Sequence, residues 1–201
     1  MLVVFDTETT GLPDFRAPSD APQQPHIVQF AALMLADDGT EEGCISTLVR
    51  PDGWSIPAEV TAIHGITTER ALSFGISEAT VVRIFLDLVE RPDVTCVAHN
   101  ESFDWRIMRI AMLRAGLDRT KIESIERVRR VCTMRMADKI MRLPPTERMQ
   151  AAGFTKTKPP SLAECMRHFF DEPHDKAHDA LADVRASARL LIHMSDLEPQ
   201  T

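Results

Sequence analysis

The sequence predicts an α/β fold, a mixed five-stranded sheet with helices packed on it. Two observations predict this fold. Short apolar runs rich in β-forming residues occur at 2–5, 26–35, 44–49, 94–98 and 128–132. Segments with apolar residues at helical spacing follow the third, fourth and fifth runs. The expected element order is therefore βββαβαβαα.

The first three strands are expected to form a meander. The run at 2–5 ends at Asp6, which predicts a buried strand with carboxylates at its C-terminal tip. Asp38-Gly39 is a hairpin signal between the second and third runs. Residues 12–25 contain four prolines, so they predict a long loop.

Capping residues predict where the helices begin and end. Ser77 is the expected cap of a helix over about 78–90, and Ser102 of a helix to about Ala115, with Gly116 as its stop. The other expected elements are a short helix to Met141, a loop over 142–160, a helix from the capping box at Ser161 to Phe170, and a helix from about Ala177 to Met194.

The composition is that of a globular protein. A length of 201 residues corresponds to roughly one domain, expected over 1–201. Hydrophobic residues make up 44%, which argues against disorder, and no stretch reaches the roughly 20 apolar residues of a membrane span. The start lacks a basic segment typical of signal peptides, and the four cysteines are far apart. We therefore expect a cytoplasmic protein with reduced thiols and no membrane partner.

The net charge of −7 limits how the chain can hold nucleic acid. A protein that grips a duplex by phosphate neutralisation alone is expected to be basic. Bound metal ions can supply the missing positive charge locally, so a nucleic-acid enzyme is still compatible with this composition. With only 9 Phe, 2 Trp and no Tyr, a broad base-stacking platform is not expected.

Two carboxylates follow the first strand. Asp6 and Glu8 are two residues apart and so project to the same side of a strand. Like charges this close repel unless a cation lies between them, and carboxylates suit Mg²⁺ or Mn²⁺. The alternative is a solvated strand end, where acidic residues are common.

Further candidates lie after the fourth strand and before the last helix. Asp104 falls in a first helical turn, where the helix dipole alone also favours an acidic residue. His178 and Asp183 are five residues apart, which separates them by about 140° on a helix. If both serve one centre, His178 must lie at or before the helix start. Asp179 is the rival ligand, because Asp179 and Asp183 are four residues apart and so lie on one face of a helix.

Taken together, these segments resemble the DnaQ-like 3′→5′ exonucleases. Asp6-Thr-Glu8-Thr-Thr-Gly11 resembles the first motif of that family, and His99-Asn100 to Asp104 the second. His178, four intervening residues and Asp183 resemble the third motif in its histidine-containing (DEDDh) form. Ile63-His64-Gly65-Ile66-Thr67 resembles a further family segment, and the resemblance spans residues 2 to about 192.

The resemblance implies a fold and a mechanism. It implies an RNase H-like fold, two divalent ions (Mg²⁺ or Mn²⁺), and release of nucleoside 5′-monophosphates from single-stranded DNA or RNA 3′ ends. The implied metal ligands are Asp6, Glu8, Asp104 and Asp183. His178 is the implied general base.

Substrate contacts and partners follow from the same resemblance. Thr9, Thr10 and Gly11 match the loop that holds the terminal nucleotide. Ile63, His64 and Phe103 match positions that pack on the terminal bases, although Phe103 is equally interpreted as core and His64 as a turn residue. Some small relatives are homodimers, so a homodimer is possible. Only 18 residues follow Asp183, so tethering to a polymerase is less expected.

Three alternatives stay open at this point. A strand-end acid pair also begins phosphatases of the haloacid-dehalogenase type, in which the first Asp is a covalent nucleophile. An exonuclease fold can also serve as a non-catalytic binding module. Cys165, His168, His174 and His178 have zinc-like spacing, but a single thiolate in an amphipathic helix argues against that site.

Overall fold

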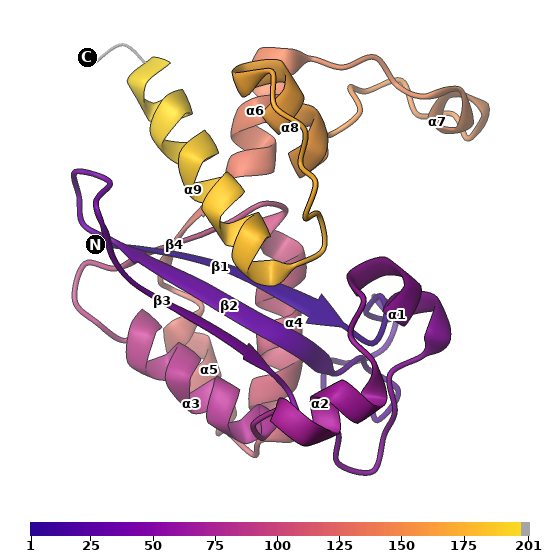
Figure 1. Ribbon diagram of the computed structural model, residues 1–201, viewed down its shortest axis with the longest axis vertical. Coiled ribbons are helices and arrows are strands. Elements are labelled where there is room, and N and C mark those ends of the chain that lie inside the picture. The colour runs from indigo at the N-terminus through magenta and orange to yellow at the C-terminus, as the bar shows by residue number, and fades with distance from the viewer. Residues whose placement is uncertain (198–201) are drawn as a thin grey trace.

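The computed structural model describes residues 1–197 and contains one mixed sheet (Figure 1). The strand order is β3-β2-β1-β4-β5. β1 pairs antiparallel with β2 and parallel with β4, β2 pairs antiparallel with β3, and β4 pairs parallel with β5. The strands are β1 (Leu2–Thr9), β2 (Ile27–Leu35), β3 (Glu41–Leu48), β4 (Thr95–Ala98) and β5 (Arg129–Cys132). The predicted five-stranded fold and the meander are confirmed.

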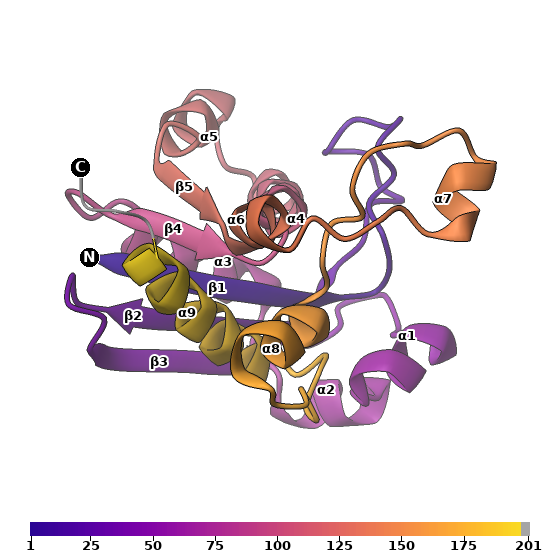
Figure 2. The same cartoon turned by 90° about the horizontal axis from the view of Figure 1, so that it is seen from above.

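Helices cover both faces of the sheet (Figures 1 and 2). On one face lie α3, α4 and α5, and on the other lies α9, flanked by α6 and α8. The helices are α1 (Ala58–His64), α2 (Thr68–Phe74), α3 (Glu78–Val89), α4 (Glu101–Arg114), α5 (Arg119–Ile125), α6 (Thr133–Met141), α7 (Glu147–Ala151), α8 (Leu162–Phe170) and α9 (Ala180–Leu197). Within residues 1–197, no helix has both the length and the apolar character needed to cross a membrane.

β1 is the central strand and is buried on both faces. Phe5 packs against Phe85 of α3, with ring centroids 5.2 Å apart, and against Trp105 of α4 at 6.2 Å. Val4 points the other way and packs with Val184 of α9. Because side chains alternate along a strand, Asp6 and Glu8 share the face of Val4 and point toward α9.

Two predicted helix starts are wrong. α4 begins at Glu101, and its cap is Asn100 in the left-handed conformation (φ 71°), not Ser102. α9 begins at Ala180 instead of Ala177, because the preceding His178 also has a left-handed backbone (φ 69°), which interrupts the helix. The caps predicted at Ser77 and the capping box predicted at Ser161 are confirmed.

Four short helices lie where no element was expected. α1 and α2 contribute to a small core with β2 and β3 that includes Val28, Leu48 and Ala71. α5 buries Ile122 and Ile125 against the main core. α7 lies inside the predicted loop 142–160 and buries none of its residues. These helices have five to seven residues each, too few to repeat a periodic pattern.

Candidate active site

The end of β1 is hydrogen-bonded to the first turn of α4. The amide of Thr7 donates to Oδ1 of Asp104 at 3.0 Å, and the Thr7 hydroxyl donates to the same oxygen at 2.8 Å. Asp104 is only 2% exposed. Two segments 97 residues apart in sequence are therefore fixed together, and Asp104 is more than an acidic residue placed by the helix dipole.

His99 anchors the turn between β4 and α4. Its Nδ1 lies 3.0 Å from the Thr133 hydroxyl, and its Nε2 lies 3.1 Å from the carbonyl oxygen of Pro160. Burial lowers the pKa of His99 to about 4, so the ring is neutral at physiological pH. The histidine of the second motif thus ties the α4 start to the segment before α8.

His178 lies outside α9, as expected if His178 and Asp183 serve one centre. Asp179 caps the helix, because its Oδ1 accepts from the amides of Leu181 and Ala182 at 3.1 Å each. Gln29 of β2 accepts the amide of Ala180 at 3.2 Å. Oδ1 of Asp179 therefore caps α9, while the charge of Asp179 still raises the pKa values of Asp6 and Glu8.

The third motif meets the first at the side chain of Glu8. Single ligand atoms of Glu8, His178 and Asp183 all lie within 4.8 Å of one another. The amide of His178 donates to Oδ2 of Asp183 at 3.2 Å, and Nε2 of His174 contacts Oδ1 of the same carboxylate. His178 is exposed, whereas the side chain of His174 is 9% exposed.

Burial and neighbouring charges raise the pKa values of three of these carboxylates. Burial raises the pKa of Asp6 well above its ordinary value, and the charges of Asp104, Asp183 and Glu8 raise it further. Burial and the charges of Asp183 and Asp104 raise the pKa of Glu8 to about 8. Burial raises the pKa of Asp104 to about 7, although the hydrogen bonds from Thr7 act in the opposite direction.

This donor set fits a hard divalent cation. Carboxylate oxygens are the ligands that Mg²⁺ and Mn²⁺ prefer. A cation among them removes the repulsion that raises their pKa values. Asp6, Glu8, Asp104 and Asp183 supply such oxygens, and the imidazole of His178 lies at the exposed side of the cluster.

The loop after β1 uses its hydroxyl groups internally. The hydroxyl of Thr9 donates to the carbonyl oxygen of Gly11 at 2.8 Å. The hydroxyl of Thr10 accepts the amide of His26 at 2.9 Å. These bonds fix the loop that the sequence resemblance assigns to the terminal nucleotide.

The other predicted substrate residues fall into two groups. Ile63 of α1 is 56% exposed, and Nδ1 of the neighbouring His64 accepts the amide of Ile66 at 3.1 Å. Burial and the charge of His178 lower the pKa of His64. Phe103, in contrast, packs partly buried against the main core.

Two residues near the site were missed from the sequence. Gln29 is 7% exposed, and a polar residue in the otherwise apolar run 27–35 was a usable signal. His174 was considered only as a zinc ligand, and no sequence pattern around it indicates the contact with Asp183. The four residues of the zinc alternative do not form a common site in the described chain: Cys165 is buried with its sulfur 3.9 Å from that of Met141, and the ring of His168 packs on Phe169.

Comparison with known sequences gives one family and two relatives. A family model described as Exonuclease, the RNase T type, matches residues 3–191. A DNA polymerase III subunit epsilon-like protein of Rhodobacter capsulatus is 41% identical over 115 residues, which cover 57% of this chain and 15% of that protein. An uncharacterized exonuclease, CP81 of Escherichia phage 186, is 28% identical over 192 residues, covering 94% of this chain and 85% of that protein.

Solved structures share the fold. E. coli exonuclease I in complex with a dA16 oligonucleotide matches with a TM-score of 0.74 and 21% identity, over 97% of this chain and 40% of that one. Exonuclease I of Methylocaldum szegediense matches with a TM-score of 0.76 and 22% identity, over 99% and 41% of the two chains. The chain spans about two fifths of these exonuclease I structures. The match of the family model to residues 3–191 shows that the chain belongs to the DnaQ-like exonuclease family, with its RNase H-like fold.

Proposed function

We propose that this protein is a metal-dependent 3′→5′ exonuclease that releases nucleoside 5′-monophosphates from single-stranded DNA or RNA ends. One observation carries the proposal. In a chain of an exonuclease family, four carboxylates and one exposed histidine gather at the carboxyl end of β1. A phosphatase with a covalent Asp has no role for the pair His178 and Asp183, which argues against that alternative.

The carboxylates would hold two divalent ions. The charges of Asp104, Asp183 and Glu8 each raise the pKa of Asp6, which supports Asp6 as one of the ligands. When bound, two Mg²⁺ or Mn²⁺ ions supply Lewis-acid stabilisation of the charge that develops on the reacting phosphate oxygens. Thr7 keeps Asp104 in place for this task through two hydrogen bonds.

His178 is the proposed general base. Imidazole takes up and releases protons near neutral pH, and a base must lie within hydrogen-bond reach of the attacking water. His178 lies outside α9 and is exposed, so its ring can approach a water beside Glu8 and Asp183. It would accept the proton of the attacking water while the 3′ oxygen leaves the phosphorus.

A single-stranded 3′ end is the proposed substrate. Structures of exonuclease I with dA16 and dT13 oligonucleotides share this fold, and a net charge of −7 disfavours a broad grip on a duplex. Thr9, Thr10 and Gly11 would contact the terminal nucleotide, with Ile63, His64 and Phe103 near its bases. A homodimer is also part of the proposal.

A time course with 5′-labelled single-stranded DNA and RNA of one sequence tests the function. We expect a ladder that shortens from the 3′ end with Mn²⁺ or Mg²⁺ and stops with EDTA, and the relative rates assign the preferred sugar. Asp6→Ala should slow the reaction at least about a hundredfold, a loss of about 3 kcal/mol in transition-state stabilisation. Intact oligonucleotides with both metals contradict the proposal. A burst of inorganic phosphate from a small phosphomonoester instead favours a phosphatase.

A further inference from the structure

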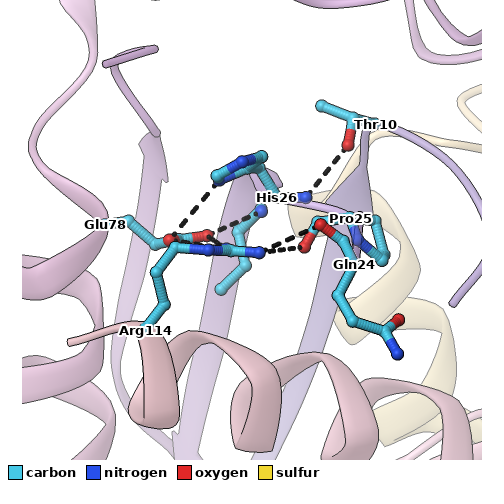
Figure 3. Close-up of polar contacts among 7 residues, drawn as sticks. Thr10, Gln24, Pro25, His26, Glu78 and Arg114 are labelled. Atoms are coloured by element: carbon cyan, nitrogen blue, oxygen red, sulfur yellow. Dashed lines mark hydrogen bonds and ion pairs between the residues drawn. The ribbon is translucent and has the colours of Figure 1, made fainter. Parts of the chain in front are cut away.

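A charged clamp, formed by Glu78 of α3 and Arg114 of α4, holds the chain just before β2 (Figure 3). Nη1 of Arg114, in the last turn of α4, donates to both carboxylate oxygens of Glu78 at 3.0 and 2.8 Å. Its Nη2 donates to the carbonyl oxygens of Gln24 and Pro25 at 3.0 and 3.1 Å. Oε1 of Glu78 also accepts the amide of Ile27 at 3.0 Å.

The clamped segment is bonded directly to Thr10. The amide of His26 donates to the Thr10 hydroxyl at 2.9 Å, and the amide of Thr10 donates to the carbonyl oxygen of His26 at 3.0 Å. The His26 ring stacks on Trp54 with centroids 4.4 Å apart, and its Nδ1 lies 3.6 Å from Glu78. Residues 24–27 are therefore coupled to Thr10 by direct hydrogen bonds (Figure 3).

The clamp is stronger than an ordinary surface ion pair. The side chain of Glu78 is 13% exposed and that of Arg114 is 29% exposed, so water screens the pair only partly. Charge-assisted hydrogen bonds are roughly twice as strong as neutral ones, and the planar guanidinium fixes direction as well as distance. The carbonyl oxygens of Gln24 and Pro25, just before β2, accept hydrogen bonds from Arg114.

One helix thus fixes both ends of the first motif. Asp104 in the first turn of α4 holds Thr7, and Arg114 in the last turn holds the segment that binds Thr10. Ten residues separate the two along α4, about 15 Å at 1.5 Å per residue. The clamp is therefore remote from the carboxylates but shares their scaffold.

We propose that Arg114 and Glu78 are positioning residues for the substrate: they hold Thr10, and with it the loop Thr9–Gly11, in the conformation that receives the terminal nucleotide. The inference rests on the proposed function for the identity of the nucleotide. The clamp does not touch the candidate metal ligands. Its loss should therefore weaken substrate binding much more than it slows the chemical step.

Arg114→Met, Glu78→Gln and Arg114→Lys test this, with Arg109→Met as the matched control. Arg109 lies on the same helix and forms an ion pair with Glu126, but it has no bond to residues 24–27. The first readout is amide hydrogen exchange at Thr10 and His26 without substrate. The second is kcat and KM on a 5′-labelled dT oligonucleotide with Mn²⁺.

We expect faster exchange at both amides and a KM about tenfold higher in Arg114→Met, with kcat within about threefold, because charge-assisted bonds to the loop are lost. Arg114→Lys should resemble Arg114→Met, since a lysine ammonium cannot bind Glu78 and the two carbonyl oxygens at once as the planar guanidinium does. Arg109→Met should change neither readout. If Arg114→Met does not fold, Glu78→Gln still tests the proposal. It removes the negative charge that pairs with Arg114 but retains a side-chain oxygen that can accept hydrogen bonds.

Three results would overturn the inference: unchanged exchange at Thr10 in Arg114→Met and Glu78→Gln, an unchanged KM despite faster exchange, or an equal fall in kcat and kcat/KM. A wild-type protein that shortens no oligonucleotide refutes the proposed function instead. The exchange measurement then still reports whether Arg114 holds Thr10, so the two failures are distinguishable. A double-mutant cycle of Arg114→Met with Thr10→Val should be non-additive, because one acts through the other.

Discussion

The candidate ligands at the end of β1 lie on a strand that is buried on both faces, whereas the candidate base lies on an exposed segment before α9. Thr7 ties the strand end to Asp104 with two hydrogen bonds. His178 has a left-handed backbone and an exposed side chain. Its backbone amide donates a hydrogen bond to the side chain of Asp183 in α9. The site therefore has a fixed half, the end of β1 with Asp104, and an exposed half, the segment that carries His178. The fold holds the first more firmly than the second.

The difference matches the two tasks that we propose. Ligands for small hard cations need fixed oxygen positions, which a buried strand supplies. A group that accepts a proton from a bound water benefits from freedom to approach and withdraw. The strand end also concentrates charge: burial and neighbouring carboxylates raise the pKa of Glu8 to about 8, and burial raises that of Asp104 to about 7.

The largest expected effect is that of Glu8→Gln in the fixed half. We expect exonuclease activity to fall at least about a hundredfold, because one ligand charge is lost. The metal-free protein should at the same time become more resistant to urea, because a repelling carboxylate is removed. Glu123→Gln, at an exposed position on α5, is the control and should change neither. Lower stability of Glu8→Gln without metal would contradict the assigned repulsion.

His178→Asn probes the exposed half. Asn tolerates the left-handed backbone but cannot act as a base near neutral pH, so kcat should fall about a hundredfold. Unfolding by urea should be nearly unchanged, because the side chain is exposed. His168→Asn on α8 serves as the control. A wild-type kcat in His178→Asn would remove this residue from the mechanism.

The pH dependence of stability should separate the halves further. Burial and neighbouring charges raise the pKa of Glu8 from 4.5 to about 8, and burial raises that of Asp104 from 3.8 to about 7. The folded state thus holds protons that the unfolded state releases. This contribution to the unfolding free energy is complete below about pH 4 and is lost as pH rises through 7 to 8.

Urea unfolding in EDTA at pH 5.5, 6.5 and 8 measures this loss, which we expect to be on the order of a few kcal/mol. Mg²⁺ or Mn²⁺ should flatten the profile, and Glu8→Gln should flatten it without metal. Stability that rises over this range in EDTA would show that the carboxylates are not held at raised pKa values.

The smallest expected effect is that of Gln29→Met, which loosens the start of α9. Gln29 accepts the amide of Ala180 in a buried position, so its loss should lower the unfolding free energy by about 1–2 kcal/mol. Because His178 lies just before that amide, kcat should also fall a few-fold. Gln150→Met on exposed α7 is the control. An unchanged stability would show that β2 does not anchor the third motif.

Local patterns were sufficient for the strands and for the set of chemically important residues. The apolar runs predicted all five strands, because a buried strand is recognisable from the hydrophobic pattern of consecutive residues. If His178 and Asp183 serve one centre, their five-residue spacing places His178 at or before the helix start, and the structure has it before α9. The order of the motifs indicated the family before any contact was known.

Local patterns failed where an unusual backbone conformation sets a helix start, or where a contact with a distant segment positions a side chain. Nothing in the sequence around Asn100 or His178 demands a left-handed backbone, so both helix starts were misplaced. The bonds from Thr7 to Asp104 and from His174 to Asp183 join segments that only the packing brings together.

The amino-acid sequence by itself thus determined the strands, the buried faces and the acidic and histidine residues, because periodicity and residue chemistry are local properties. The tertiary structure alone decided how these residues meet. α4 and α9 pack on opposite faces of one sheet, and their first turns converge on the end of β1. The same packing places Arg114 against the segment before β2, a contact across 90 residues that no spacing or period encodes.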